Sequence, residues 1–456
     1  MPLAAHTMLD GAMSFNSVLA RGRRALMRVA VSLGSRGGSG GGGGVDLSAI
    51  KKFPAHTHFV LQRDAVDPVA QIAETRAGEP VHRLTRFLGM DVWLVTGDAE
   101  AREMLVNSAD LSNDLRHLLG NRKRSAAEQV GGLGMTDPPD HTRLRKVLTP
   151  EFTKRRLQRL EPAIDRVVQE CLDDMETRGG VIDLVDRFGF QVPFQVICDL
   201  LGMPEVDREG FRSLGAARFD LSAGGAGSFD AAKSTREFLI DLVERQRTER
   251  TVHPDGLLAA IIDDHGEEFD SVEIGGLADG VFLGGYETSA SMLSLGTYVL
   301  LSHPDSYERL RTGTSEEVDE IVEELLRYVC PVQVAFPRFA RRDFTLAGVQ
   351  VREGDIVLTS LAGANRDPLA HSAADAFDPT KPSAGQLAFG HGLHRCVGAE
   401  LARMELRTAL RALATRFPDM ALAVEPGELE FTELSAVYSV EALPVRLHAS
   451  APTPAG

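Results

Sequence analysis

The chain has 456 residues, of which 43% are hydrophobic and 25% are charged, as in an ordinary globular protein. Its 49 basic and 65 acidic residues give a net charge of −16, which argues against bulk electrostatic binding to nucleic acid or to an anionic membrane. The four cysteines are far apart and form no paired motif. A zinc site or disulfide framework is therefore not expected, and a reducing cytoplasm is the expected location.

The N-terminal stretch differs in composition from the rest of the chain. Residues 37–44 are almost pure glycine, which predicts a flexible tail or an over-long start. The apolar run Val29 to Leu33 that follows an arginine cluster is too short for a signal-peptide core or a membrane span. We predict a tail over 1–45, one domain over 46–450 and a C-terminal tail over 451–456.

The first part of the domain predicts a hairpin followed by helices. Two strand-like runs, 81–87 and 91–95, flank a turn, and a helical pattern covers 98–107. A glycine-rich polar stretch then leads to a proline-fixed turn and a helix that carries His141 and Arg145 one turn apart on one face. This pair is either a solvated basic face or a binding site for a buried anion.

The middle of the chain is mainly helical. Two helices, 206–218 and 229–247, are separated by a glycine-rich link at 223–227. A very long helix is predicted from about Ser271 to Leu301, about 45 Å in length. From Val281 to Leu301 its only charge is Glu287, yet its glycines and hydroxyls make it too polar to span a membrane, so it must be buried.

Residues 284–288, Gly-Gly-Tyr-Glu-Thr, stand out within that helix. The paired glycines weaken the helix where an acid and a hydroxyl occur together. One interpretation is a kink with Thr288 bonded to its own turn. The other is a site at which Glu287 and Thr288 pass protons to a bound molecule.

Further on, a capping box at Thr314 and Glu317 opens a helix that carries Glu324 and Arg327. Such an i, i+3 pair, if exposed, contributes only about 0.2 to 0.5 kcal/mol. A β-rich segment follows from Pro331, and the run 431–444 alternates as a hairpin does.

Near the C-terminus, Cys396 lies in a glycine-rich loop directly before an amphipathic helix. The apolar positions of this helix lie on one face and three arginines on another: Ala402, Leu406, Ala409, Leu410 and Leu413, with Arg403, Arg407 and Arg411. A helix N-terminus and nearby cations lower the pKa of a thiol, and the thiolate is the form that binds metal. The alternative is a buried, inert thiol.

The decapeptide 389–398, Phe-Gly-His-Gly-Leu-His-Arg-Cys-Val-Gly, resembles the haem-ligand loop of the cytochromes P-450, Phe-Gly-x-Gly-x-His-x-Cys-x-Gly, at every fixed position. Three more motifs of the family occur in its order: His-x-x-x-Arg at His141 and Arg145, the oxygen-binding motif at 284–288, and Glu-x-x-Arg at Glu324 and Arg327. The resemblance covers residues 53–448.

The resemblance implies one mainly α-helical domain with a small β-rich side, the cytochrome P-450 fold, and a haem b bound to the Cys396 thiolate. Further cofactor contacts would come from Phe389, Gly390 and Gly284. The propionates would be held by His394, His141, Arg145 and Arg338, with Arg341 and Arg342 as alternatives to the last. Glu287 and Thr288 would be catalytic. Glu324 and Arg327 would be structural, and the arginine that usually joins them is replaced by Lys381.

The implied activity is a haem-thiolate monooxygenase that inserts one oxygen atom of O₂ into a hydrophobic small molecule, by hydroxylation or epoxidation. The sequence has no dinucleotide fingerprint and no iron–sulfur cysteine set, so electrons would come from NAD(P)H through a ferredoxin reductase and a ferredoxin. The ferredoxin would dock on a basic patch: Arg403, Arg407, Arg411, Lys146, Lys154, Arg155 and Arg156. Two alternatives stay open, a peroxide-driven peroxygenase and a haem protein that senses or binds without turnover.

The same resemblance makes the helices at 206–218 and 229–247 a lid over the substrate channel. Four apolar residues would line the pocket: Leu283, Val334, Phe336 and Val440. We expect a monomer that binds no nucleic acid and has no membrane span.

Overall fold

The computed structural model describes residues 54–87, 89–114, 132–219, 226–381 and 385–448. The two predicted tails and most of the glycine-rich link at 223–227 lie outside these residues. The helices that the text uses are α2 (Ala70–Gly78), α3 (Asp98–Val106), α5 (Asp140–Leu148), α6 (Lys154–Leu157), α7 (Glu161–Arg178), α8 (Gln191–Leu201), α9 (Glu205–Phe219), α10 (Ala226–Glu249), α11 (Leu257–His265), α12 (Ser271–Leu301), α13 (Pro304–Thr312), α14 (Ser315–Val329), α15 (Leu361–Ala364) and α16 (Ala399–Arg416).

The strands are short and form four small sheets. They are β1 (Arg63–Asp64), β2 (Asp67–Pro68), β3 (Val81–Phe87), β4 (Met90–Val95), β5 (Leu111–Ser112), β6 (Val181–Asp183), β7 (Arg338–Ala340), β8 (Phe344–Leu346), β9 (Val349–Val351), β10 (Ile356–Thr359), β11 (Ala421–Leu422) and β12 (Pro444–Arg446). The largest sheet has the order β3-β4-β10-β7-β5, with β10 parallel to β4. It gathers strands from both ends of the domain.

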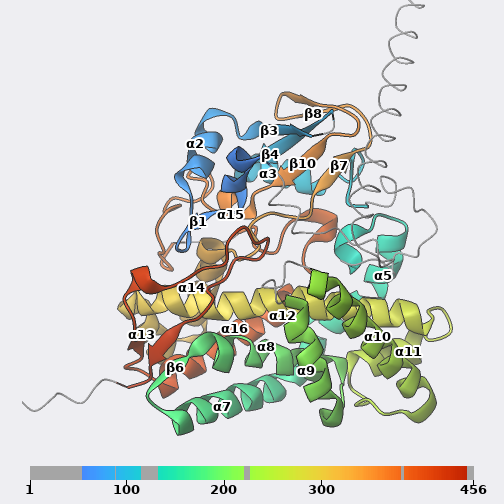
Figure 1. The fold of residues 1–456 in the computed structure, drawn as a ribbon, viewed down its shortest axis with the longest axis vertical. Coiled ribbons are helices and arrows are strands. Elements are labelled where there is room, and N and C mark those ends of the chain that lie inside the picture. Colours follow the sequence, from blue (N-terminus) through green and yellow to red (C-terminus); the bar gives the residue numbers. More distant parts are fainter. Residues whose placement is uncertain (1–53, 88, 115–131, 220–225, 382–384, 449–456) are drawn as a thin grey trace, which may run out of the picture.

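Helix α12 crosses the middle of the molecule and separates two regions (Figure 1). The sheet, α2 and α3 lie on one side of it, and α7, α8 and α9 lie on the other. The side chain of Asp270 accepts a hydrogen bond from the Glu273 amide and so caps the helix. Most of the helix is buried in the large core, because its apolar residues occur on nearly all sides.

Several predicted elements are confirmed. The long helix runs from Ser271 to Leu301, the hairpin is β3 and β4, and the predicted capping box opens α14. Helices α9 and α10 match the predicted pair. The C-terminal run pairs as a hairpin only in part, through the bridge from Phe431 to Val440 and neighbouring bonds.

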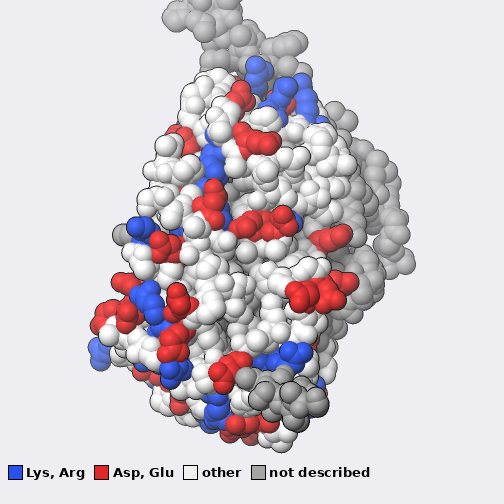
Figure 2. Space-filling model, turned by 90° about the vertical axis from the view of Figure 1, so that its left-hand side faces the viewer, with Lys and Arg blue, Asp and Glu red and all other residues white. Residues whose placement is uncertain are grey.

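The surface carries charges of both signs. On the face in Figure 2, acidic and basic side chains are interspersed, and uncharged areas lie between the groups. Within the described residues, no helix is long and apolar enough to cross a membrane.

Candidate functional site

The Cys396 loop needs its glycines for two different reasons. Gly390 and Gly392 both have positive φ values, 67° and 72°, where other residues are strained. A Cβ at Gly392 would also lie 2.8 Å from the Leu105 carbonyl oxygen of α3. The loop is closed by the Cys396 amide, which donates to the Phe389 carbonyl over 2.9 Å. Glycine thus lets the loop turn and lets it pack directly on α3.

Arg145 holds the same loop from α5. Its guanidinium donates to the carbonyl oxygens of Leu393, over 3.2 Å, and Arg395, over 2.8 Å. These bonds give Arg145 partners within the chain that its predicted role toward an anion did not include. The resemblance offered no signal for them, because they depend on the loop conformation.

The environment of the Cys396 thiol opposes the predicted lowering of its pKa. Burial raises the pKa, while the Gly398 amide and the cations Arg145, Arg395 and Arg403 act in the other direction. The prediction of a lowered pKa is therefore wrong for the thiol by itself, since desolvation is the larger effect. Cys396 is nevertheless an exposed residue. A thiol that keeps its proton when alone can still bind a metal, because the metal displaces the proton.

A cluster of buried nitrogen groups lies next to this loop. The rings of His141 and His394 are 4.4 Å apart, and Arg338 is close enough to lower the pKa of both. Burial is the main cause of the lowered values, about 4 for the pKa of His141 and about 3 for that of His394. In the described part of the chain, both ring nitrogens of His141 and the Nε of Arg338 are buried without a partner.

Such orphaned groups are costly unless something binds them. Asp137, the carboxylate that raises the pKa values of these histidines, already accepts from Ser112 and from the Asn113 amide and pairs with Arg341. Buried cations and ring N–H groups without a counter-ion suit an anion with two carboxylates. The haem propionates fit this donor set.

The structure also separates the three candidate arginines. Arg338 on β7 is 2% exposed and belongs to the histidine cluster. Arg341 and Arg342 lie at the surface, where they pair with Asp137 and Asp110. Arg338 is therefore the arginine that can reach a buried anion at the cluster.

The two glycines of the α12 motif face different surroundings. A Cβ at Gly284 would meet nothing within 4 Å, whereas one at Gly285 would lie 3.0 Å from Ile197 of α8. Gly285 thus allows close helix packing, and exposed Gly284 leaves space for a flat group. The Thr288 hydroxyl donates to the Gly284 carbonyl over 2.7 Å, as in one of the two interpretations, but α12 is continuous there. The paired glycines do not break the helix.

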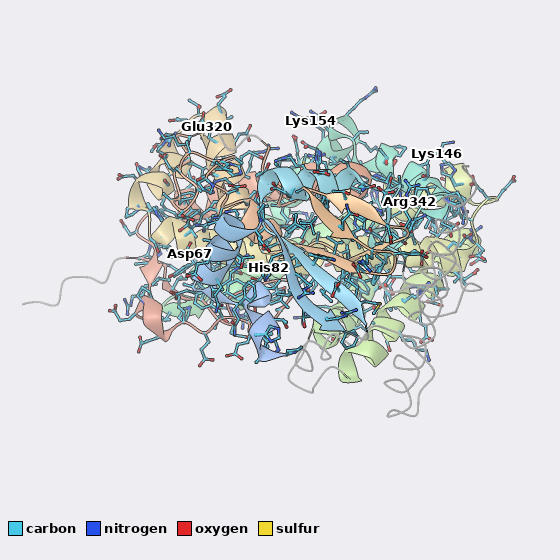
Figure 3. The ribbon with its side chains drawn as sticks, turned by 90° about the horizontal axis from the view of Figure 1, so that it is seen from above. Asp67, His82, Lys146, Lys154, Glu320 and Arg342 are labelled. Carbon is cyan, nitrogen blue, oxygen red and sulfur yellow. The ribbon has the colours of Figure 1, made fainter. Side chains whose placement is uncertain are left out.

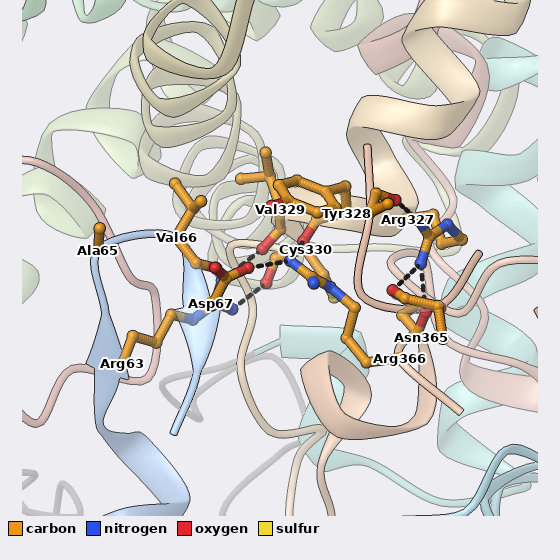
Figure 4. A network of polar contacts seen from close by, with 12 residues as sticks. Arg63, Ala65, Val66, Asp67, Arg327, Tyr328, Val329, Cys330, Asn365 and Arg366 are labelled. Atoms are coloured by element: carbon orange, nitrogen blue, oxygen red, sulfur yellow. Dashed lines mark hydrogen bonds and ion pairs between the residues drawn. The ribbon is translucent and has the colours of Figure 1, made fainter. Parts of the chain in front are cut away.

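Glu324 and Arg327 form a buried ion pair, 2% and 3% exposed, with two hydrogen bonds of 2.7 and 2.8 Å. The other donors of Arg327 reach the backbone carbonyls of Asn365, Ala373, Ala374 and Ala376. The Asn365 side chain in turn accepts from the Leu387 amide, two residues before Phe389. This network ties α14 to the segment that enters the cysteine loop. Figure 4 shows the contact of Arg327 with Asn365 beside a second network around Arg63 and Arg366.

The predicted basic patch is divided. The three α16 arginines of the predicted patch have partners within the chain: Arg403 pairs with Glu323 and Glu400, Arg407 with Asp319, and Arg411 donates to the Gly313 carbonyl. Arg156 pairs with Glu151. Lys146, Lys154 and Arg155 are exposed, and Figure 3 places Lys146 and Lys154 along one edge of the molecule. Among the described residues, the exposed cations of the patch without an ion-pair partner are Lys146 on α5 and Lys154 and Arg155 on α6.

The predicted pocket residues have different positions. Phe336 is 47% exposed, and its ring lies against Gly134, where a Cβ would be 2.4 Å from the Phe336 Cε2. Leu283 and Val334 are half-buried. Val440, by contrast, packs in the large core and is 2% exposed, so its predicted role in the pocket is not supported by its position.

The sequence did not predict how the two lid helices contact α12. Phe211 of α9 stacks with Phe238 of α10 at 5.3 Å and lies 4.5 Å from Phe282 of α12. Phe282 stacks with Tyr286, within the 284–288 motif, at 5.3 Å. Aromatic contacts thus run from both helices to this motif.

Comparison with known proteins gives consistent matches. The model of the family described as "Cytochrome P450" matches residues 226–418. The chain is 36% identical to the 6-deoxyerythronolide B hydroxylase of Saccharopolyspora erythraea, over 84% of this chain and 96% of that protein. It is 38% identical to the vitamin D(3) 25-hydroxylase of Pseudonocardia autotrophica, over 84% and 94%. The structure of P450 StaH from glycopeptide antibiotic A47934 biosynthesis superposes with a TM-score of 0.77 at 35% identity, over 85% of this chain and 99% of that one.

Proposed function

Since the chain belongs to the cytochrome P450 family and is a P450 monooxygenase, we propose that it inserts one atom of O₂ into a hydrophobic small molecule, by hydroxylation or epoxidation. The observation that carries this proposal is the cluster of His141, His394 and Arg338 beside the accessible Cys396 thiol. Haem b suits both features, because its iron binds a thiolate ligand and its two propionate carboxylates can accept from buried donors.

In this proposal the Cys396 thiolate binds the iron, and the loop residues Phe389 and Gly390 pack near it. His141, His394 and Arg338 hold the propionates, and Gly284 on α12 leaves room for the ring. A neutral imidazole still offers one N–H, and a carboxylate close by raises the histidine pKa from its lowered value. Haem with a thiolate ligand supplies the activation of dioxygen and the oxidation of a C–H or C=C bond.

The chain itself provides a path for protons at Thr288. Its hydroxyl hydrogen is engaged with the Gly284 carbonyl, so the oxygen lone pairs are free to accept a hydrogen bond. A proton accepted at this oxygen can be exchanged for the hydroxyl proton, and the neighbouring half-buried Glu287 is an acid that can supply it. Arg145 acts as a brace for the loop through its two carbonyl contacts.

The substrate is proposed to be hydrophobic because the predicted pocket residue Phe336 is exposed and Leu283, Val334 and the neighbouring Val281 are half-buried. The names of two relatives give 6-deoxyerythronolide B and vitamin D3 as their substrates. Both compounds belong in the first panel to screen.

Electrons are proposed to come from NAD(P)H through a reductase and an acidic ferredoxin. We place its docking surface on the exposed cations Lys146, Lys154, Arg155 and Arg395, because Arg403 and Arg407 of α16 are paired with acids within the chain. Reversing the charges of Lys154 and Arg155 is expected to lower ferredoxin-supported turnover, with a salt-dependent loss of binding. Arg407→Gln is the matched control and should have a smaller effect. Equal effects would contradict this placement.

The test of the function begins with the spectrum of the reduced, carbon monoxide-treated protein, which should be of the thiolate type and be lost in Cys396→Ala. Compounds that shift the haem spectrum are then incubated with either NAD(P)H, reductase and ferredoxin or hydrogen peroxide. A product containing one oxygen atom from O₂ in the first reaction supports the proposal. A product formed with peroxide alone favours a peroxygenase, and absence of the thiolate spectrum overturns the haem site.

A further inference from the structure

A buried acid outside the residues discussed so far lies between α16 and α12. Glu405, nine residues after Cys396, is 3% exposed and accepts a hydrogen bond from the side chain of Ser289 on α12. Ser289 directly follows Thr288 in the sequence. Within the described residues, the Oε1 of Glu405 is buried and has no hydrogen-bond partner. One carboxyl group therefore joins the helix after the cysteine loop to the helix of the 284–288 motif.

No cation neutralises this carboxyl group among the ion pairs of the described residues. Helices α6, α7, α12, α13 and α14 pack against α16. Many charged groups of these helices pair with one another or with α16: Glu323 with Arg403, Asp319 with Arg407, Asp173 and Glu176 with Arg416, Arg309 with Glu317 and Glu320, Glu308 with Arg311, and Glu324 with Arg327. On α12, Glu273 pairs with Arg143, and buried Asp279 accepts from the Thr235 hydroxyl. Lys154, Arg155 and Asp165 are exposed. Glu287 lies two residues from Ser289 on α12, and Glu400 pairs with Arg403.

An ionised carboxylate in such a place is strongly disfavoured, so the group holds a proton at neutral pH. Burial raises the pKa of Glu405 to about 8, against a smaller lowering by the Ser289 hydroxyl. A carboxyl group of this kind changes its charge in response to small changes in nearby charge.

We propose that Glu405 is a buried proton-binding site that couples reduction of the haem to proton uptake. The proposal rests on the proposed haem at Cys396. Above about pH 8 the carboxyl group of the oxidised protein is ionised. When one electron then enters the haem from an external reductant, one O–H bond of water breaks, its proton forms an O–H bond with the Glu405 carboxylate, and hydroxide is left in the solvent. The proton is taken up because the added negative charge makes the ionised carboxylate less favourable.

The position of Glu405 suits this coupling. Its residue lies six positions after the start of α16, about 9 Å along the helix axis. By Coulomb's law, a unit charge about 10 Å from a redox group, at an effective dielectric constant of about 20, changes the reduction equilibrium of that group by about tenfold. For a one-electron couple this corresponds to about 59 mV.

The competing explanation is that Glu405 only ties two helices together. A structural tie would change stability when it is removed, but it would not make the reduction equilibrium depend on pH. The pH dependence therefore separates the two roles.

The experiment is an equilibrium reduction of the haem-loaded full chain with dithionite and mediators between pH 6.5 and 9.5. In the unchanged protein, the equilibrium should shift toward the oxidised form by about tenfold across the upper part of this range. Glu405→Gln should remove that shift. Ser289→Ala, which removes the donor that favours the carboxylate, should move the shift to higher pH.

Glu400→Gln is the matched control, since this acid is on the same helix but has Arg403 as its partner. Its pH dependence should match that of the unchanged protein, even if the equilibrium differs at every pH. A thiolate-type spectrum combined with an unchanged pH dependence in both Glu405→Gln and Ser289→Ala would overturn the coupling and leave the proposed function intact. Loss of the thiolate spectrum in the unchanged protein would instead overturn the haem site.

Discussion

Two of the buried arginine clusters among the described residues differ in how the arginine donors are used. Arg327 donates to Glu324 and to four backbone carbonyls. Arg338 lies by two histidines, and its Nε has no partner within the described residues. The first cluster is satisfied by the chain alone, and the second is suited to a group that the chain does not supply.

The difference has an energetic consequence. Breaking a satisfied buried ion pair leaves an uncompensated charge and costs about 3 to 5 kcal/mol. In the second cluster, burial lowers the pKa of His141, His394 and Arg338, which means that the charged forms are disfavoured before an anion binds. Removing a cation there should cost the haem-free protein little and cost haem binding much.

The largest effect is expected from Arg327→Leu. The change removes the cation that pairs with buried Glu324, which keeps the hydrogen bond from the Asp378 amide, and leaves four carbonyls without this donor, so the free energy of unfolding should fall by about 3 to 5 kcal/mol. Denaturant unfolding measures it. The double variant Glu324→Leu with Arg327→Leu is the control and should recover part of the loss, because no buried charge remains. Equal stability of the single variant and the unchanged protein would contradict a structural role.

Arg338→Leu tests the second cluster. We expect haem affinity to fall about 10- to 100-fold, because a charge-assisted hydrogen bond contributes about 1.5 to 3 kcal/mol. The stability of the haem-free protein should change little. Haem transfer to an acceptor protein measures the affinity. Arg341→Leu is the matched surface control and should keep its haem. A loss of stability in haem-free Arg338→Leu, similar to that of Arg327→Leu, would remove the distinction between the clusters.

Replacing His141 should also change how the stability of the haem-free protein depends on pH. Its pKa in the folded protein, about 4, is below its ordinary value, so its contribution to stability is present above pH 6.5 and is lost as the pH falls toward 4. We expect the unchanged haem-free protein to lose about 1 to 2 kcal/mol more than His141→Phe between pH 7 and pH 5. Thermal unfolding at the two pH values provides the comparison. Equal losses in both proteins would show that His141 does not titrate as its burial requires.

Sequence patterns predicted the elements well but not the charge partners. Apolar spacing and capping residues act within one segment, so α12, α14 and α16 were predicted close to their observed bounds. The partners of Arg145, Arg403 and Arg407 come from loops and helices far along the chain, and spacing contains no information on them. Glu405 was missed because an acid in a helix following Arg403 looks like an ordinary surface residue.

The sequence also could not show which of Arg338, Arg341 and Arg342 reaches the buried site. All three have the same side chain and lie within five positions of one another. They are distinguished only by the burial of β7, which contains Arg338, and by the pairing of Arg341 with Asp137 and of Arg342 with Asp110. The family resemblance predicted a propionate-binding arginine, and the fold indicates which of the three residues it is.

The smallest effect concerns the satisfied cluster and the lysine that replaces an arginine of the family. Lys381 lines a cavity of about 10 Å³ together with Glu324, Arg327 and His371, enough space for about one water molecule. The Nε2 of His371 is buried there without a partner in the described residues. Lys381→Arg would place a planar fork of donors beside Glu324, and we expect it to raise the free energy of unfolding by about 0.5 to 1 kcal/mol.

Denaturant unfolding of Lys381→Arg, with Lys381→Met as the matched control without charge, measures this gain. If the arginine stabilises only by filling the cavity, the two variants should be equally stable. If it completes the ion-pair network, the arginine variant should be more stable than both the control and the unchanged protein, and the difference should disappear in an Arg327→Leu background because the two sites are coupled. An arginine variant that is less stable than the unchanged protein would mean that this cluster is already complete with lysine.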